Sequence, residues 1–258
     1  MGENTGQKTK DEQFHSCGLW PMASYINHCC YSNARRAFIG DMMVVRATQD
    51  IAPDTEITFW YQAPAADSYS ERQKKLRHWG FKCSCAICRD DQTAMESVVK
   101  RRGLKAEVLK YVQLRNKTAP SRIETLLATM AKTYRRPAAE VPRLSIWDLQ
   151  LSLAGIYMQQ DQPKNAVDSA LRALQSLGYV IDGGNLPRIL GMPMVIKQWG
   201  VMMDSLVNCW MLLSAAYKLV APDLEAQAER YARISYSICV GEDETFEDSY
   251  GKLGRYLI

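Results

Sequence analysis

The sequence contains no run of about 18 consecutive apolar residues, the length that a membrane-spanning helix requires. Its first segment, MGENTGQKTKDEQ, is polar and has no apolar core of the kind found in secretory signals. We therefore expect an intracellular protein, in the nucleus or the cytoplasm, that makes no contact with a membrane. In such a reducing compartment its eight cysteines would stay free or bind a metal.

Dense clusters of basic residues are also missing. The formal net charge is only +4, and the basic runs KKLRH, KRRGLK and YRRP are short. Arms that bind nucleic acids carry a more concentrated positive charge. We interpret these runs as solvated faces of helices and expect no direct contact with nucleic acids.

The chain has enough apolar material for a substantial core, since 47% of its 258 residues are hydrophobic and 23% are charged. This length suits one large or two modest domains. We expect residues 1–13 to be disordered. In residues 14–90, the segments AFIGDMMVVRAT and EITFWYQ are rich in β-branched and aromatic residues, which predicts a short antiparallel unit of strands at 37–47 and 56–61. Residues 91–258 show helical periodicity, so the predicted fold is an α+β unit followed by an all-α domain.

Two stretches of the helical half share a pattern in which large residues on one helix precede small residues on the next. The pattern comprises Leu153, Ala154 and Tyr157 followed by Ala166, Ala170 and Ala173, and then Trp210, Leu213 and Tyr217 followed by Ala226. Tetratricopeptide hairpins require such pairing, because two helices approach closely only where small residues face large ones. We therefore predict a tetratricopeptide-like domain whose surface binds a peptide or protein partner, with generic antiparallel helices as the alternative.

Three further features set the limits of these helices. The second helix of the first pair is predicted to begin at QPKN and to stop at Gly178. The two tyrosines of the pattern are 60 residues apart (217 minus 157) instead of about 34, and the Gly- and Pro-rich stretch GGNLPRILGMP accounts for the excess. The segment RRPAAEVPR, residues 135–143, is the predicted hinge or linker.

The segment FKCSCAIC places Cys83, Cys85 and Cys88 in a C-x-C-x-x-C cluster. Three such thiolates can converge on one tetrahedral Zn²⁺, but a closed structural site needs a fourth ligand. The candidates upstream are Cys29 and Cys30, whereas the next cysteine downstream lies deep in the helical half. Unligated buried cysteines are the alternative. The spacing therefore predicts a zinc ion that joins the segment after residue 80 to the NHCC segment.

Three segments together resemble the SET-domain protein-lysine methyltransferases. NHCCYSN is similar to the N-H-S-C-x-P-N signature of that family, and DTEITFWY resembles its G-E-E-[LI]-x-x-x-Y segment. RQKKLRHWGFKCSCAIC resembles the post-SET tail of the SET–MYND subgroup. The three motifs occur in the order of the family, and a tetratricopeptide-like region also suits that subgroup and its fungal relatives.

The resemblance implies a role for each motif residue. Asn27 and His28 would meet the cofactor S-adenosylmethionine, and Phe81 would pack on its adenine. Tyr61 would supply the catalytic hydroxyl group. The implied zinc ligands are Cys30, Cys83, Cys85 and Cys88. The substrate would be a lysine side chain of a protein, either a histone or another protein.

This chain departs from the family pattern at several positions. Cys29 replaces a serine, Ser32 replaces a proline, and a bulky Trp60 precedes the motif tyrosine. The segment before Asn27 is short and mostly polar, without the Gly-x-Gly loop of the first SET half. The resemblance therefore extends over the second half of a SET domain with its post-SET tail, in residues 14–90, and the helical region, 91–258. Two hypotheses follow: a lysine methyltransferase, or a catalytically inactive SET remnant that serves as a zinc-stapled interaction scaffold.

Overall fold

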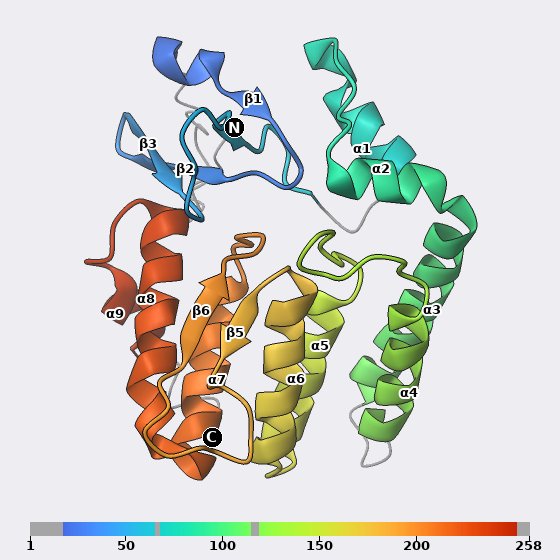
Figure 1. Cartoon of the computed structure of the whole chain (residues 1–258), viewed down its shortest axis with the longest axis vertical. Helices are drawn as coiled ribbons and strands as arrows, with labels where there is room; N and C mark the ends of the chain where they lie inside the picture. The colour runs from blue at the N-terminus through green and yellow to red at the C-terminus, as the bar shows by residue number, and fades with distance from the viewer. Residues whose placement is uncertain (1–17, 65–67, 115–118, 252–258) are drawn as a thin grey trace, which may run out of the picture.

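The computed structural model of the chain describes residues 18–64, 68–114 and 119–251, so the segment predicted to be disordered, 1–13, lies outside the described residues. We call residues 18–64 the β unit and residues 68–251 the helical region. In Figure 1 the β unit lies above helices α5 to α8, while α3 and α4 lie at one side.

The β unit contains the elements η1 (Pro21–Tyr25), β1 (Asn27–His28), β2 (Ala34–Ile39), β3 (Met42–Ala47) and β4 (Thr58–Phe59). The first part of the helical region contains α1 (Tyr69–Leu76), η2 (Arg77–Trp79), α2 (Ala86–Thr93), α3 (Met95–Leu114) and α4 (Ala119–Ala131). The remainder contains α5 (Trp147–Gln159), α6 (Pro163–Ser176), β5 (Val180–Asp182), β6 (Val195–Gln198), α7 (Leu206–Val220), η3 (Pro222–Leu224), α8 (Glu225–Val240) and α9 (Phe246–Tyr250).

The strands pair differently from the sequence prediction. The segment 37–47 is not one strand, because a turn at Gly40, with φ of 60°, folds it into the β2–β3 antiparallel hairpin. Strand β4 does not join this hairpin. It pairs in parallel with β1, so that Asn27 lies opposite Thr58 and His28 lies opposite Phe59. The prediction of a single antiparallel unit was therefore wrong, since the second motif pairs with the first.

Helices α5 to α8 pack side by side and supply most of the core. Helix α6 begins at Pro163, a residue whose fixed φ suits the first helical turn, and the chain leaves it through Gly178. Gly178 has φ of 98°, and a Cβ atom there would lie 3.1 Å from the carbonyl oxygen of Ala138. Both the left-handed conformation and the close approach require glycine. The predicted limits of this helix are confirmed.

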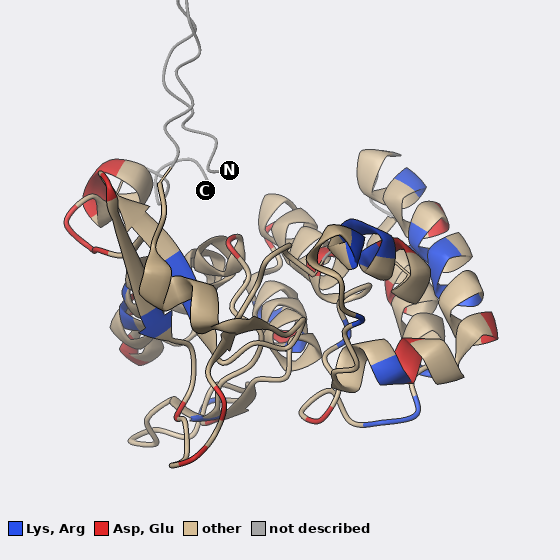
Figure 2. Ribbon diagram, turned by 90° about the horizontal axis from the view of Figure 1, so that it is seen from above, with Lys and Arg blue, Asp and Glu red and all other residues tan. Residues whose placement is uncertain are grey.

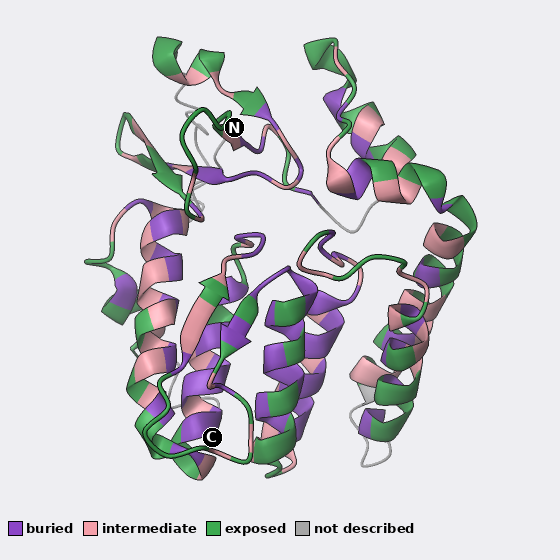
Figure 3. Cartoon of the chain, in the orientation of Figure 1, coloured by how far each residue is buried: buried purple, intermediate pink, exposed green. Residues whose placement is uncertain are grey.

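The predicted large and small faces are buried, with one exception. Figure 3 shows buried residues concentrated along α5, α6 and α7, whereas β3 is largely exposed. Trp210 and Tyr217 are fully buried, as are the three alanines predicted on α6. Ala226 is exposed, because the small residues that α8 turns toward its neighbour are Ala228 and Ala232. The Gly- and Pro-rich interruption is the connection of a hairpin formed by β5 and β6, which sequence periodicity did not reveal.

Polar contacts fix the β unit against the helical region. Arg46 donates a hydrogen bond of 2.8 Å to the carbonyl oxygen of Gly241, at the end of α8, where a cation is favoured by the helix dipole. Arg35 donates to the carbonyl oxygen of Met202 at 3.0 Å and forms an ion pair with Asp204. These contacts hold β2 and its flanking motif segments in a fixed position over α7 and α8.

The basic runs are not all solvated helix faces. Arg101, in KRRGLK, is buried and forms an ion pair with Asp91. The run YRRP is exposed except for the half-buried Tyr134, but it lies in the irregular connection between α4 and α5 and not on a helix. Figure 2 shows Lys and Arg spread over several helices, with Asp and Glu between them. Within the described residues, none of the helices combines the length and the apolar character that crossing a membrane requires.

Candidate metal centre and cofactor site

Side-chain amides join the first two sequence motifs. Asn27 donates from Nδ2 to Oε1 of Glu56 at 2.6 Å. Asn33 donates from Nδ2 to the carbonyl oxygen of Glu56 at 2.9 Å, and its Oδ1 accepts from the backbone N–H of Thr58 at 2.8 Å. Because an amide both donates and accepts, Asn33 can satisfy two backbone groups of the second motif. This explains why NHCCYSN and DTEITFWY lie together at the β1–β4 pairing.

Four cysteine sulfurs converge beside this pairing. The Sγ atoms of Cys30, Cys83, Cys85 and Cys88 all lie within 4.8 Å of one another. Cys30 Sγ is 3.9 Å from that of Cys83 and 3.7 Å from that of Cys88. Zn–S bonds of about 2.3 Å in a tetrahedron place neighbouring sulfurs about 3.8 Å apart. The donor set and its spacing therefore fit one zinc ion, and a disulfide would need far shorter separations.

The protonation of the thiols reflects this crowding. The hydrogen bond with Cys30 lowers the pKa of Cys83 to about 4. The hydrogen bond with Cys29 is the largest cause that lowers the pKa of Cys85 below its ordinary value, whereas the hydrogen bond with Cys83 raises the pKa of Cys30. Thiolates this close repel one another, so they cannot all ionise without a cation. A bound metal ion would supply that charge and favour the ionised form of all four.

Cys29 and Cys30 are adjacent but have different surroundings. Cys30 is buried among the other sulfurs, whereas Cys29 is half-buried and its Sγ contacts the carbonyl oxygen of Tyr31 at 3.1 Å. Cys29 also forms a hydrogen bond with Cys85, yet it does not belong to the four-sulfur group. The structure therefore selects Cys30 over Cys29 as the candidate fourth ligand.

Helices α1 and α2 position the remaining ligands. Cys85 is the N-cap residue of α2, and Cys88 lies in its first turn. Gln73, on α1, accepts from the backbone N–H of Cys83 at 2.9 Å and donates to its carbonyl oxygen at 3.2 Å. Gln73 Nε2 also lies 3.6 Å from the sulfur of Cys88. Such a residue orients the ligands of a metal and is part of the site, although the sequence alone gave no signal for it.

The imidazole of His28 connects the sulfur cluster to Tyr61. Its Nδ1 accepts from the backbone N–H of Tyr61 at 3.1 Å, and its Nε2 lies 3.4 Å from Sγ of Cys30. A ring nitrogen that accepts carries no proton, so the hydrogen of the neutral imidazole is on Nε2 and points toward the sulfur. Both nitrogens are thus used within the protein. Any contact of His28 with a cofactor would have to use its backbone or the face of its ring.

Tyr61 lies at the centre of an aromatic cluster. Its ring centroid is 5.8 Å from that of Phe59, 5.2 Å from that of Trp79 and 6.0 Å from that of Phe81, the last in an edge-to-face arrangement. The hydroxyl group donates to the carbonyl oxygen of Ile26 at 2.9 Å. Phe81 is half-buried and Trp79 is 40% exposed, so both keep accessible ring surface. Trp79 was not recognised from the sequence, where it is one aromatic residue next to a basic run.

Trp60 has a structural environment that differs from that of its neighbour. Successive residues of an extended chain point to opposite sides, so Trp60 turns inward where Tyr61 turns toward the aromatic cluster. Trp60 is buried, and the guanidinium group of Arg35 lies 4.4 Å from its ring centroid. The unusual tryptophan before the motif tyrosine therefore packs in the core of the β unit.

Comparison with known proteins agrees with this geometry. Residues 3–62 match the family model of the SET domain. A methyltransferase of Gibberella zeae is 35% identical over 248 residues, which cover 93% of this chain and 34% of the relative. The histone-lysine N-methyltransferase ASHR1 of Arabidopsis thaliana is 39% identical over 71 residues, 28% of this chain and 15% of the relative.

A human relative matches about half of the chain. The histone-lysine N-methyltransferase SMYD3 of Homo sapiens is 26% identical over 136 residues, 52% of this chain and 32% of the relative. The chain thus spans about a third or less of the length of each of these three proteins. The resemblance seen in the three sequence motifs is confirmed: the chain is similar to the SET domain and to SET-type lysine methyltransferases.

Proposed function

We propose that this chain contributes to S-adenosylmethionine-dependent transfer of a methyl group to a lysine side chain of a protein, in the nucleus or the cytoplasm. The observation that carries the proposal is the β1–β4 pairing, which brings Asn27 and His28 beside Tyr61 and next to the four-sulfur cluster. Two of the relatives are named histone-lysine N-methyltransferases, which makes a histone one candidate substrate.

The residues of the aromatic cluster suit a purine-bearing cofactor. S-adenosylmethionine, when bound, supplies an electrophilic methyl group on a sulfonium. Phe81 would offer an aromatic face for the adenine, and Asn27 with the backbone of His28 would hold the cofactor at the end of β1. The imidazole of His28 would meanwhile keep its hydrogen bonds to Cys30 and Tyr61.

Tyr61 is the proposed catalytic residue. Transfer of a methyl group to an amine requires an in-line arrangement, so catalysis depends mainly on alignment and on a neutral amine. An aromatic surround disfavours the charged ammonium and lowers the pKa of a lysine. The Tyr61 hydroxyl, held 2.9 Å from the Ile26 carbonyl oxygen, would orient that amine by a hydrogen bond.

The zinc site would have a structural role. An ion held by Cys30, Cys83, Cys85 and Cys88 would join the post-SET segment to β1 and would place Phe81 two residues before its first downstream ligand. We also propose that the helix pairs α5–α6 and α7–α8 form a tetratricopeptide-like region that binds a peptide or protein. Support comes from the close packing of α6, whose three alanines are fully buried, against α5.

A calorimetric titration of S-adenosylmethionine into the zinc-loaded chain tests the cofactor site. We expect micromolar affinity, lowered at least tenfold in the Asn27→Ala variant, because that change removes the amide that links β1 to Glu56. Asn165→Ala, an exposed amide on α6, is the matched control and should bind normally. If the folded, zinc-loaded chain shows no heat of binding, the scaffold hypothesis takes precedence over the enzyme.

Tyr61→Phe tests the hydroxyl group separately from the fold. We expect methyl transfer to core histones to fall by about 100-fold, since loss of one positioned hydrogen bond typically has an effect of this size on the rate. Affinity for S-adenosylmethionine should change less than twofold, and stability by no more than about 1 kcal/mol, for the bond to Ile26. Tyr25→Phe, at an 82% exposed position, serves as the control in the radiolabelled methyl-transfer assay. Unchanged transfer in Tyr61→Phe would remove this residue from the mechanism.

A further inference from the structure

A pocket beside α2 is lined by none of the residues proposed to hold the cofactor. It has a volume of about 470 Å³ and is formed by the outer face of α2 and the start of the connection between α4 and α5. Its lining residues are Ala86, Arg89, Asp90, Thr93, Arg135 and Arg136. A volume of this size is in the range of pockets that hold ligands.

The charges of this pocket are not balanced. Three arginines face a single carboxylate, that of Asp90, and within the described part of the chain Arg89, Arg135 and Arg136 form no ion pair. All three side chains are exposed. Guanidinium groups that gather without counter-charges repel one another, and an anion bound between them would relieve that repulsion.

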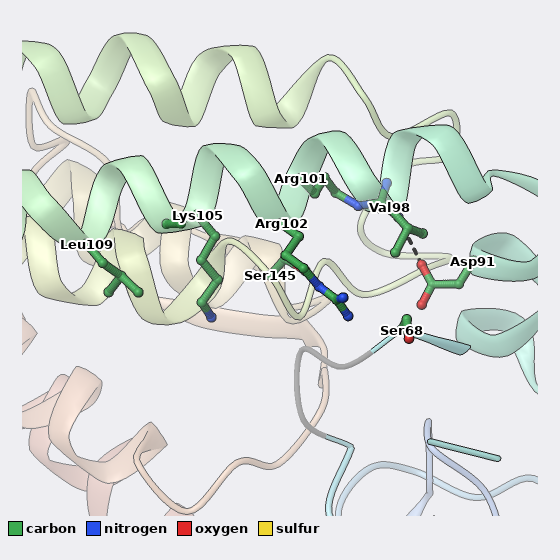
Figure 4. Close-up of a pocket in the computed structure, with 9 residues that line it drawn as sticks. Ser68, Asp91, Val98, Arg101, Arg102, Lys105, Leu109 and Ser145 are labelled. Carbon is green, nitrogen blue, oxygen red and sulfur yellow. Dashed lines mark hydrogen bonds and ion pairs between the residues drawn. The ribbon is translucent and has the colours of Figure 1, made fainter. Parts of the chain in front are cut away.

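A neighbouring pocket shows the contrast (Figure 4). It is lined by residues of α3 together with Ser68, Asp91 and Ser145, and has a volume of about 230 Å³. Each cation that lines it has a carboxylate partner, in the pairs Arg101–Asp91 at 2.9 Å, Arg102–Glu71 at 2.6 Å and Lys105–Asp148 at 2.6 Å. The pocket on α2 differs from this neighbour because none of its three arginines has a carboxylate partner among the described residues.

A fourth guanidinium group lies behind the pocket. Arg143 donates from Nη2 to the carbonyl oxygen of Arg136 at 3.4 Å, and its guanidinium carbon lies 5.3 Å from the ring centroid of Tyr134. The Nε atom of Arg143 is buried and has no hydrogen-bond partner among the described residues. It adds a further positive charge that no carboxylate of the described chain neutralises.

We infer that Arg89, Arg135 and Arg136 form a docking site for a short acidic segment of a partner protein. A guanidinium group pairs with a carboxylate through two parallel hydrogen bonds, and arginine clusters recognise acidic motifs in this way. The pocket is compact and has no aromatic side chain in its lining, whereas a nucleic acid needs a longer basic track and surfaces for base stacking. A segment with two or three Asp or Glu residues matches both its size and its charge.

The site is adjacent to the metal centre. Arg89 directly follows the zinc-ligand candidate Cys88 on α2, and Arg135 with Arg136 belongs to the connection that leads into α5. A partner held there would contact α2 and the connection between α4 and α5 at once. This docking site is independent of methyl transfer, so it can exist whether or not the cofactor site is active.

Fluorescence anisotropy with a labelled peptide of five glutamates tests the inference on the zinc-loaded full chain. We expect saturable binding at 50 mM salt that weakens at least tenfold in the double variant Arg135→Gln/Arg136→Gln and at least threefold in Arg89→Gln. The matched control is Arg102→Gln/Arg172→Gln, which removes the same charge at two exposed, paired arginines. That control should bind the peptide within twofold of the unmodified chain.

Three results would overturn the inference. These are the absence of saturable binding, an equal loss of binding in the control double variant, and a preference for a short DNA duplex over the peptide. Arg89, Arg135 and Arg136 are exposed, so their variants should keep the unfolding temperature of the parent. Inorganic phosphate, titrated as a competitor, distinguishes a general anion site, where it would displace the peptide at low millimolar concentration, from recognition of an extended acidic segment.

Discussion

Replacing Cys88 by serine is expected to abolish zinc binding, whereas replacing Cys29 by serine is expected to leave it intact. Both changes exchange one sulfur for one oxygen, but only Cys88 belongs to the four sulfurs that lie within 4.8 Å of one another. Cys29 is the direct neighbour of Cys30 in the sequence but lies outside the four-sulfur group. The two variants therefore test whether the position of the sulfur, and not the number of cysteines, determines zinc binding. Purified protein should hold one zinc ion per chain by mass spectrometry of the metal, with almost none in Cys88→Ser.

The expected stability change is large, because the metal joins segments that are distant in sequence. Cys30 and Cys88 are 58 residues apart, and few backbone hydrogen bonds connect their segments directly. Apparent binding energies of structural zinc in small domains are about 10–16 kcal/mol, and most of this becomes folding energy. A chelator, or Cys88→Ser, should therefore release the segment around Phe81 and lower the unfolding temperature. Helices α5 to α8 pack without the cluster and should remain folded.

Circular dichroism measures the expected fall in unfolding temperature, and hydrogen exchange locates the segments that lose structure. Loss of protection should be confined to the segments that carry the sulfurs and to the adjacent β1–β4 pairing. An equal loss of zinc in Cys29→Ser would contradict the assignment, because it would mean that Cys29 also holds the metal. Retention of zinc in Cys88→Ser would show that the ion is held by another set of residues.

The grouping of Cys83, Cys85 and Cys88 could be foreseen from the sequence, but the fourth member of the sulfur cluster could not be derived from spacing alone. The C-x-C-x-x-C motif places three sulfurs within six consecutive residues, so the sequence itself shows that they lie close together. The choice between Cys29 and Cys30 depends on which side chain the backbone after β1 turns inward. In the structure that is Cys30, with Cys29 directed to the carbonyl oxygen of Tyr31. The family resemblance implied the same residue, Cys30, that the structure places in the four-sulfur cluster.

The main error of the sequence prediction was that it missed the β1–β4 pairing, on which the proposed cofactor site depends. Strands β1 and β4 have two residues each and are about 30 residues apart. Neither is long enough to show an alternating pattern that would predict its pairing. Their association depends on the side chains of Asn27, Asn33 and Glu56. The longer hydrophobic patterns of α5 and α6 were predicted correctly, because each helix shows its buried face in its own sequence.

The basic run KRRGLK shows a further limit of sequence patterns. Charge runs usually lie in solvent, but Arg101 is buried beside Arg72, from another helix, and Asp91 bridges them. The Asp91 carboxylate accepts from Arg72 at 2.7 Å and from Arg101 at 2.9 Å. Burial acts to lower the pKa of Arg72, but the charge and the hydrogen bond of Asp91 raise it by more. No local pattern in the sequence distinguishes this aspartate from its exposed neighbours.

Asp91→Ala is therefore expected to destabilise the protein by about 3–5 kcal/mol, because it removes the carboxylate that two buried guanidinium groups share. For a chain of this size such a loss lowers the unfolding temperature by roughly 10 °C. Asp168→Ala removes a carboxylate from the Asp168–Arg172 pair, in which both side chains are more than half exposed, and should have an effect of no more than about 0.5 kcal/mol.

The position of Asp91 next to the cysteine cluster leads us to expect that Asp91→Ala also weakens zinc binding. Asp91 lies on α2 three residues after Cys88, and Arg72 on α1 precedes Gln73, whose side chain bonds the backbone of Cys83. Loosening the ion pairs should therefore weaken zinc binding as well as the fold, measured by competition with a coloured chelator at 25 °C, where the variant is still folded. If Asp91→Ala lowers the unfolding temperature no more than Asp168→Ala does, Arg72 and Arg101 become hydrated in the variant. Their ion pairs with Asp91 then contribute little to the stability of the fold. If Asp91→Ala lowers stability but leaves zinc affinity unchanged, the metal site does not depend on the ion pairs that α2 forms through Asp91.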